Sequence, residues 1–171
     1  CSSLTSIKLG KGNTEYTSED GVLFNKNKTT LIQFPAGKSG HYAILDSVTS
    51  IRPGAFSYCS GLTSIRIPDS VTSIGGSVFY RCSSLTSIEV GKGNTKYSSE
   101  DGVLFDKNKT ELIQFPAGKS GHYTIPESVT KIGTGAFYRC SSLTSVTIPD
   151  SVTSIGEGTF EGCSSLTSVT I

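Results

Sequence analysis

The chain has 171 residues, a net charge of +1 and only 17% charged residues. A charge this small, with basic residues dispersed along the chain, argues against nucleic acid or an anionic membrane as partner. Apolar runs stay below the ~18–20 residues that a bilayer-spanning helix needs, so we expect no membrane insertion in this segment.

An internal repeat of 81 residues dominates the sequence. The heptapeptide CSSLTSI at Cys1 returns at Cys82 and, as CSSLTSV, at Cys163, and residues 31–42 recur unchanged as residues 112–123. A further cysteine divides each block, so the sequence predicts one array of residues 1–58 (long unit), 59–81 (short coil), 82–139 (long unit), 140–162 (short coil) and 163–171 (partial coil). Because both ends fall inside the pattern, we expect a fragment of a longer array.

The short coil at 59–81 predicts two strands and a corner. Ile65 and Ile67 alternate with Arg66, which is typical of a strand with one buried face, and Pro68 ends that strand. A second extended segment follows from Val71 to Ile74, and the stretch from Phe79 to Ser83 has room for a helical or 3₁₀ turn. Such a small circuit cannot bury its apolar residues alone, so stacked coils with parallel strands are expected.

The long unit at 82–139 adds an insert at residues 91–125. Its apolar runs at 103–105 and 112–115 flank a hairpin turn predicted at 106–109. Ile113-x-Phe115-Pro116 repeats the spacing of Ile65-x-Ile67-Pro68, so we interpret the insert as an extra coil with a projecting hairpin.

These motifs resemble the BspA-like (Treponema-type) leucine-rich repeat of bacterial surface proteins. The resemblance rests on Leu62-x-x-Ile65-x-Ile67-Pro68, on Val71-x-x-Ile74-Gly75 and on Ala136-Phe137-x-x-Cys140, and it covers the whole chain. The asparagine that normally follows the strand is replaced by Pro68-Asp69-Ser70, so the turn there should differ. The resemblance implies a leucine-rich-repeat β-solenoid, exposure at the cell surface or outside the cell, and a role in adhesion.

The outward positions of the predicted strands are the candidate binding residues. In each coil the first outward residue is Ser and the second varies, so an exposed sheet with one free position per coil could recognise a partner. The alternative is that these residues only make the surface soluble. The variable positions are Lys8, Arg66, Glu89, Thr147 and Thr170.

No motif predicts catalysis, a cofactor or a metal. The five cysteines are expected to be free and buried, because stacked coils direct their side chains in parallel into the core. His41 and His122 lack Cys or acidic partners in their motifs and are expected at the surface or in packing. The acidic pairs at 19–20 and 100–101 indicate turns.

Three further motifs are treated as coincidental. The Gly-Lys-Ser motifs at 37–39 and 118–120 lack the first glycine of a phosphate-binding loop. Residues 106–117 lack the glycine and final glutamate of a calcium loop. The sequons at Asn27 and Asn108 lie at the predicted hairpin tips.

Two functions remain open at this point. The first is a non-enzymatic cell-surface or secreted protein that binds a protein or glycan, because every motif is duplicated whereas an enzyme needs one asymmetric site. The second is a structural array that stacks end to end as a spacer or filament, since exposed sheet edges template further pairing.

Overall fold

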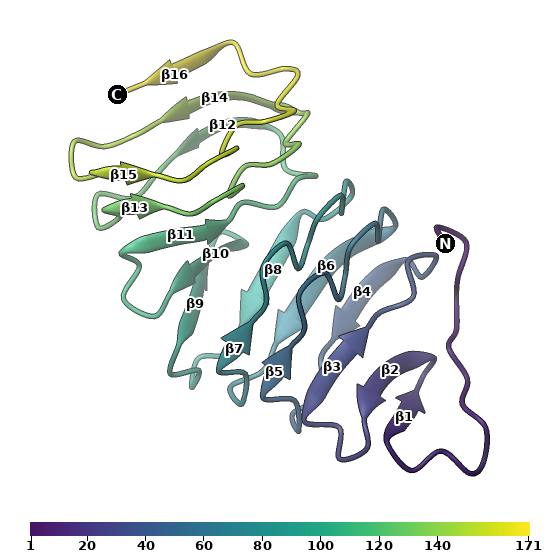
Figure 1. The fold of residues 1–171 in the computed structure, drawn as a ribbon. Helices are drawn as coiled ribbons and strands as arrows, with labels where there is room; N and C mark the ends of the chain where they lie inside the picture. The colour runs from purple at the N-terminus through teal and green to yellow at the C-terminus, as the bar shows by residue number, and fades with distance from the viewer.

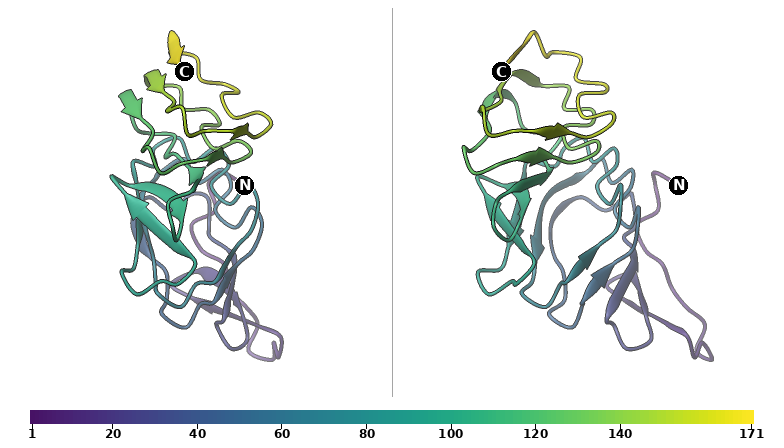
Figure 2. Two further views of the ribbon diagram at one scale, coloured as in Figure 1. Left: turned by 90° about the vertical axis from the view of Figure 1, so that its left-hand side faces the viewer. Right: turned by 60° about the vertical axis from the view of Figure 1, so that its left-hand side comes forward.

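The computed structural model describes residues 1–171 and contains strands and turns but no helix, so it has none that could cross a bilayer. The chain winds into a β-solenoid whose N-terminal residues and C-terminal coil lie at opposite ends of the stack (Figures 1 and 2). The predicted stack of parallel strands is confirmed. It is divided into two modules, residues 1–90 and 91–171, each with two sheets.

The first module pairs a sheet of short strands with a sheet of longer ones. The short-strand sheet has the order β1-β2-β3-β5-β7, with bounds Tyr16–Glu19, Val22–Asn25, Thr30–Gln33, Ser50–Ile51 and Ser73–Ile74. The other sheet has the order β4-β6-β8, with bounds Gly40–Ala43, Leu62–Ile67 and Ser87–Val90.

The second module repeats this arrangement. Its short-strand sheet has the order β9-β10-β11-β13-β15, with bounds Tyr97–Glu100, Val103–Asp106, Glu111–Gln114, Lys131–Ile132 and Ser154–Ile155. Its other sheet has the order β12-β14-β16, with bounds Gly121–Thr124, Leu143–Thr147 and Ser168–Thr170.

The short coil at 59–81 follows its sequence pattern closely. Ile65 and Ile67 of β6 are fully buried while Arg66 is exposed, and β6 ends at Ile67, immediately before Pro68. Gly75 follows β7 where two coils come very close, because a Cβ there would lie 2.2 Å from the backbone N of Pro53. Only glycine allows this approach without moving a coil.

The predicted helical turn is not a helix. Between Ser77 and Leu85 the chain makes separate turns, in which Tyr80, Cys82 and Leu85 donate backbone hydrogen bonds to residues three positions earlier. Arg81 lies in the left-handed region with φ 59°, which prevents these turns from joining into a regular 3₁₀ helix.

Stacked phenylalanines run through each module. Phe34, Phe56 and Phe79 follow one another with ring centroids 5.1 and 5.7 Å apart. Phe115, Phe137 and Phe160 do the same at 5.0 and 5.4 Å. Neighbouring coils therefore bury each other's largest side chains, which a single circuit cannot do alone.

The insert forms the predicted hairpin and a second hairpin that was not predicted. β10 and β11 pair antiparallel around the turn at 106–109, which confirms that prediction. β9 also pairs antiparallel with β10. The turn between them consists of Asp101 and Gly102, both with positive φ (50° and 76°), as two-residue hairpin turns require. Glu100 is the last residue of β9 and Asp101 follows it, so the acidic pair marks a turn, as predicted.

The register proposed for Ile113-x-Phe115 is wrong. β11 pairs in parallel with β13 in the short-strand sheet, while β12 is the strand that pairs with β14. The spacing misled because both kinds of strand carry alternating apolar residues before a proline. The insert is nevertheless an extra coil with added hairpins.

β10 separates the two hydrophobic cores. Leu104 packs in the core of the first module, whereas Val103 and Phe105 pack in the core of the second. All three side chains are fully buried, so this strand has two apolar faces. The two modules therefore share β10, which contributes side chains to both cores.

Candidate functional site

The solvent side of sheet β4-β6-β8 brings two predicted binding residues together. Ala43, Arg66 and Glu89 lie side by side in register, and all three are exposed. Arg66 and Glu89 make no ion pair, so both charges face solvent. The second row holds His41, Ser64 and Ser87. We call these six residues the arginine face.

The solvent side of sheet β12-β14-β16 has a different outer row. Thr124, Thr147 and Thr170 lie in register there, next to a second row of His122, Ser145 and Ser168. We call these six residues the threonine face. It carries hydroxyl and imidazole groups and no carboxylate or ammonium group.

The five predicted residues do not form one continuous row. The hairpin of β9 and β10 covers the outer edge of β8, where Ile88 N donates to Gly102 O at 2.9 Å and Val90 N donates to Ser99 Oγ at 2.9 Å. The sheet therefore stops at β8 and restarts at β12. Lys8 lies in no strand, so it belongs to neither face.

Both histidines lie at the surface, as predicted, and each begins a row of serines. His41 Nδ1 lies 2.8 Å from Ser64 Oγ, and His122 Nδ1 lies 2.8 Å from Ser145 Oγ. His122 Nε2 also lies 2.9 Å from Thr124 Oγ1. These contacts orient each ring along its face.

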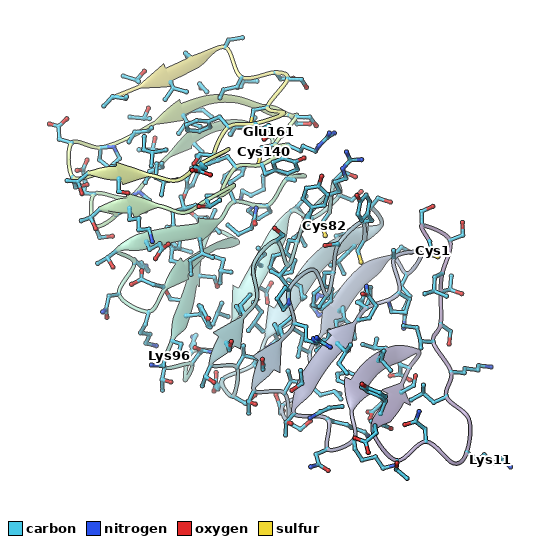
Figure 3. The ribbon with its side chains drawn as sticks, viewed as in Figure 1. Cys1, Lys11, Cys82, Lys96, Cys140 and Glu161 are labelled. Carbon is cyan, nitrogen blue, oxygen red and sulfur yellow. The ribbon has the colours of Figure 1, made fainter.

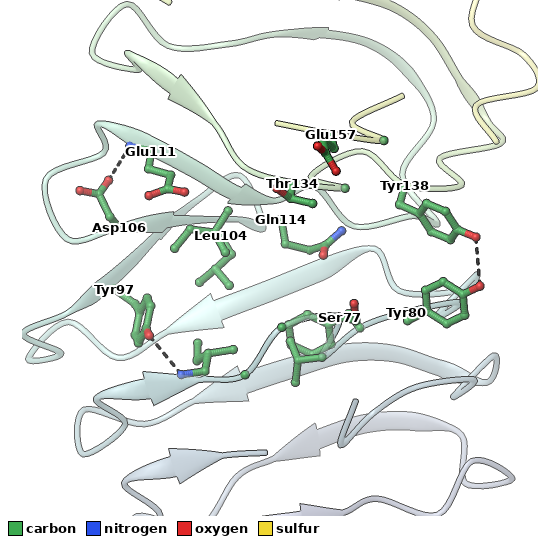
Figure 4. A pocket seen from close by; sticks show the side chains of 18 of the residues that line it. Ser77, Tyr80, Tyr97, Leu104, Asp106, Glu111, Gln114, Thr134, Tyr138 and Glu157 are labelled. Carbon is green, nitrogen blue, oxygen red and sulfur yellow. Dashed lines mark hydrogen bonds between the residues drawn. The ribbon is translucent and has the colours of Figure 1, made fainter. Parts of the chain in front are cut away.

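A cleft separates the two modules on the short-strand side (Figure 4). It has a volume of about 750 Å³, and no residue of the arginine or threonine face lines it. One wall is the chain from Ile74 to Tyr80, and the other is β11 with the turns near Thr134 and Glu157. Acidic and aromatic side chains predominate among its functional groups, namely Asp106, Glu111, Glu157, Glu161, Tyr80, Tyr97 and Tyr138.

Tyrosines join the modules at both ends of the cleft. Ile74 N donates to Tyr97 Oη at 3.1 Å, and Tyr138 Oη donates to Tyr80 Oη at 3.1 Å (Figure 4). The rings of Tyr80 and Tyr138 are stacked, with centroids 4.9 Å apart. Hydrogen bonding with Tyr80, together with a hydrogen bond from Arg139 Nε, lowers the pKa of Tyr138.

Two arginines cover the outer tyrosines. The guanidinium of Arg81 lies 5.4 Å from the ring of Tyr58 and 5.6 Å from that of Tyr80, and Arg139 lies 5.6 Å from the ring of Tyr138. Tyr58 is 51% exposed. An exposed group of Tyr and Arg has the composition of protein interfaces. The only sign of this group in the sequence is the tetrapeptide Phe-Tyr-Arg-Cys, which occurs at 79–82 and again at 137–140.

The cysteines are free thiols with unequal exposure. Cys59, Cys82 and Cys140 are buried, as predicted, whereas Cys163 is half-buried and Cys1 is exposed (Figure 3). Cys1 departs from the prediction because it lies outside the stack. A hydrogen bond with Cys59, together with burial, raises the pKa of Cys82. The hydrogen bond from Cys140 lowers the pKa of Cys163 to about 7.

The remaining motifs have structural roles. Asp106 caps its turn by accepting hydrogen bonds from the backbone N of Thr110 and of Glu111, both at 2.7 Å. Lys119 of the second Gly-Lys-Ser motif donates to Asp101 O at 2.6 Å. The sequon residues Asn27 and Asn108 are both exposed at their turns.

Solved structures with this architecture come from several bacteria. A leucine-rich cell surface protein from Faecalibacterium prausnitzii is 29% identical, with a TM-score of 0.61, over 92% of this chain and 40% of its own. Pneumococcal vaccine antigen PcpA is 24% identical, with a TM-score of 0.67, over 78% of this chain and 39% of its own. The T. pallidum leucine-rich repeat protein is 24% identical, with a TM-score of 0.52, over 95% of this chain and 71% of its own. At that identity, the last two establish the fold alone.

The fold is thus that of a bacterial leucine-rich-repeat solenoid of the surface-protein type, a class that is typically non-catalytic. The profile of the BspA type leucine-rich repeat region matches in six copies, over residues 1–101, 38–121 and 119–171. The chain belongs to this family. It spans about two fifths of the length of the Faecalibacterium and pneumococcal proteins. No curated protein matches it.

Proposed function

We propose that this chain is a non-enzymatic binding module of a cell-surface or secreted protein and that it engages a protein or glycan ligand in adhesion. The observation that carries the proposal is the difference between the two faces. Their second rows are identical, His-Ser-Ser, while their outer rows are Ala43, Arg66, Glu89 and Thr124, Thr147, Thr170. One scaffold thus presents two different recognition surfaces.

The chemistry of each face suits a different contact. Arg66 offers a planar set of donors for a carboxylate or sulfate group, and Glu89 can accept hydrogen bonds from a ligand's ammonium or hydroxyl groups. The threonine face offers neutral hydroxyl groups held in register by the strands. Rigid strands keep these groups in fixed positions, which lowers the entropy cost of binding.

Duplication of the motifs supports binding over catalysis. His41 and His122 have equivalent positions and equivalent serine partners. Catalysis needs one constellation of a nucleophile or an acid and base, held at a single place. Neither histidine has a carboxylate or cysteine partner of that kind.

The test compares variants of the two faces on the same ligands. Screening the whole chain against purified matrix proteins and a glycan array gives the candidate ligands. We expect Arg66→Ala/Glu89→Ala or Thr147→Ala/Thr170→Ala to weaken a genuine ligand about tenfold or more, as loss of a central contact does. Lys92→Ala/Glu15→Ala, two exposed positions off both faces, is the matched control. Unchanged binding by both face variants would refute the proposal.

End-to-end stacking is the second candidate. Apolar side chains are exposed on both outer coils, with Leu4 and Tyr16 at one end and Ile155 and Val169 at the other. Exposed apolar surface of this kind favours association. Small-angle scattering at increasing protein concentration distinguishes the candidates, because a constant particle length excludes stacking.

A further inference from the structure

The coils are joined by a regular ladder of backbone hydrogen bonds at the corner that precedes each cysteine. In the first module the N–H groups of Gly54, Phe56 and Tyr58 donate to the next coil, at distances of 3.2, 3.1 and 2.7 Å. In the second module the N–H groups of Gly135, Phe137 and Arg139 do the same, at 3.0, 3.1 and 2.8 Å. Each corner thus offers three donors, at alternate residues, to the coil above it.

The ladder is missing at the cleft. The equivalent N–H groups belong to Ser77, Phe79 and Arg81, and they donate to no acceptor in the chain. The next coil, where their acceptors would lie, is displaced by the insert, and the cleft occupies its place. Phe79 is buried, and buried main-chain donors without partners are uncommon in folded proteins, so this site points to an acceptor from outside the chain.

Backbone carbonyl groups of a bound peptide are acceptors that could complete this ladder, as the carbonyl groups of the next coil do elsewhere in the chain. Ser77 and Phe79 line the cleft, whereas Arg81 does not, so two of the three donors are open to a peptide there. Pairing of a peptide backbone with an open backbone edge is a common mode of peptide recognition.

The opposite wall favours positive charge in that peptide. Glu157 and Glu161 are exposed and form no ion pair, and Glu111 contributes a third carboxylate, paired with Lys131 at 2.9 Å. Arg81 and Arg139 lie over the tyrosine rings at one end and do not line the cleft.

Backbone strain marks the same wall. Ser77 has a φ of 54°, in the left-handed region, whereas the equivalent positions are Gly54, Gly135 and Gly158. A serine in this conformation costs free energy that glycine avoids, and such strain concentrates at ligand-binding segments.

We propose that the cleft between the modules binds a peptide segment with basic side chains. The peptide carbonyls accept hydrogen bonds from the N–H groups of Ser77 and Phe79, and its basic side chains face Glu157 and Glu161. This site is separate from the arginine and threonine faces, so it does not depend on the function proposed for them.

The experiment follows backbone amides in the intact chain by NMR and hydrogen exchange. The probe is a synthetic peptide of alternating Thr and Lys, added up to about 1 mM. We expect the amides of Ser77 and Phe79 to exchange fast in the free chain and to become protected with the peptide. The equivalent amides of residues 54, 56 and 58 and of residues 135, 137 and 139 are the internal control, since they are protected throughout.

Variants and control ligands decide the outcome. Glu157→Gln/Glu161→Gln should weaken the peptide about three- to tenfold, whereas Glu15→Gln/Glu127→Gln should not, because those glutamates lie outside the cleft. Arg66→Ala/Glu89→Ala should leave peptide binding unchanged, which separates this site from the arginine face.

Three results would overturn the proposal. The first is a lack of protection at the amides of both Ser77 and Phe79 with the Lys peptide. The second is equal binding of a peptide with Glu in place of Lys. The third is protection by a neutral oligosaccharide but not by the peptide, which would assign the cleft to a glycan.

Discussion

The two copies of the insert have nearly the same sequence but different surroundings. β2 and β10 share the residues Val-Leu-Phe, yet Leu23 is only half-buried while Leu104 is fully buried. Tyr16 is 44% exposed, whereas its equivalent Tyr97 is half-buried and bonded to Ile74. The hairpins form in both copies, so local sequence is enough to build them. Contact with a preceding coil determines how much of each hairpin is buried.

The asparagines show the same difference in hydrogen bonds. Asn13 and Asn94 each accept two backbone hydrogen bonds within their own turn. Asn94 also donates to Pro68 O and Val71 O, both at 2.9 Å, and is fully buried. The insert thus supplies an asparagine to the turn in which the short coil has none of its own.

The largest expected effect comes from the leucine pair. Leu104→Ala should lower the free energy of unfolding by about 3 kcal/mol, because it opens a cavity between the two cores. Leu23→Ala should cost about 1 kcal/mol, since its side chain is partly solvated already. Urea unfolding followed by circular dichroism measures both. Equal losses would mean that the modules do not stabilise each other through β10.

The asparagine pair should show a smaller difference. Asn94→Ala removes four buried hydrogen bonds and should lower the free energy of unfolding by about 2 kcal/mol. Asn13→Ala should lower it by less than about 1 kcal/mol. The same denaturation experiment applies, with hydrogen exchange of the Lys96 and Tyr97 amides as a local readout. If Asn13→Ala lowered the free energy of unfolding more than Asn94→Ala, the hydrogen bonds from Asn94 to Pro68 and Val71 would not contribute to stability as expected.

The smallest expected effect is a difference in thiol reactivity between two equivalent cysteines, which does not change the fold. Cys82 and Cys163 are equivalent, but Cys82 is buried with a raised pKa, and the pKa of Cys163 is lowered to about 7. Cys163 should gain reactivity toward iodoacetamide as the pH rises through about 7, because the thiolate is the reacting form. Cys82 should stay unmodified. Mass spectrometry of short labelling pulses at several pH values checks this, and rapid labelling of Cys82 would show that the first module opens.

Periodic residues made most of the architecture predictable. Alternation at Ile65 and Ile67, the proline after them and the constant cysteine spacing specify stacked coils with parallel strands. The hairpin at 106–109 followed from polar turn residues between two apolar runs. Arg66 and Glu89 were placed correctly as neighbours, because alternation alone decides which side chains face solvent.

The features that sequence reasoning missed depend on contacts between distant segments. β9 has the sequence Tyr-Ser-Ser-Glu, which lacks an apolar pattern, and it is a strand because β10 supplies its partner. The break between the two faces was missed for the same reason, since the hairpin covers β8. The cleft could not be predicted either, because the residues that line it come from six separate turns and strands.

The interruption of the phenylalanine stack between Phe79 and Phe115 has a mechanical consequence. Within a module, a bending load is shared by stacked rings and a continuous ladder of backbone bonds. Between the modules that ladder has a gap, and β10, Asn94 and two tyrosine hydrogen bonds carry the load in its place. We therefore expect the solenoid to bend between its two modules, and a peptide bound in the cleft should reduce this bending.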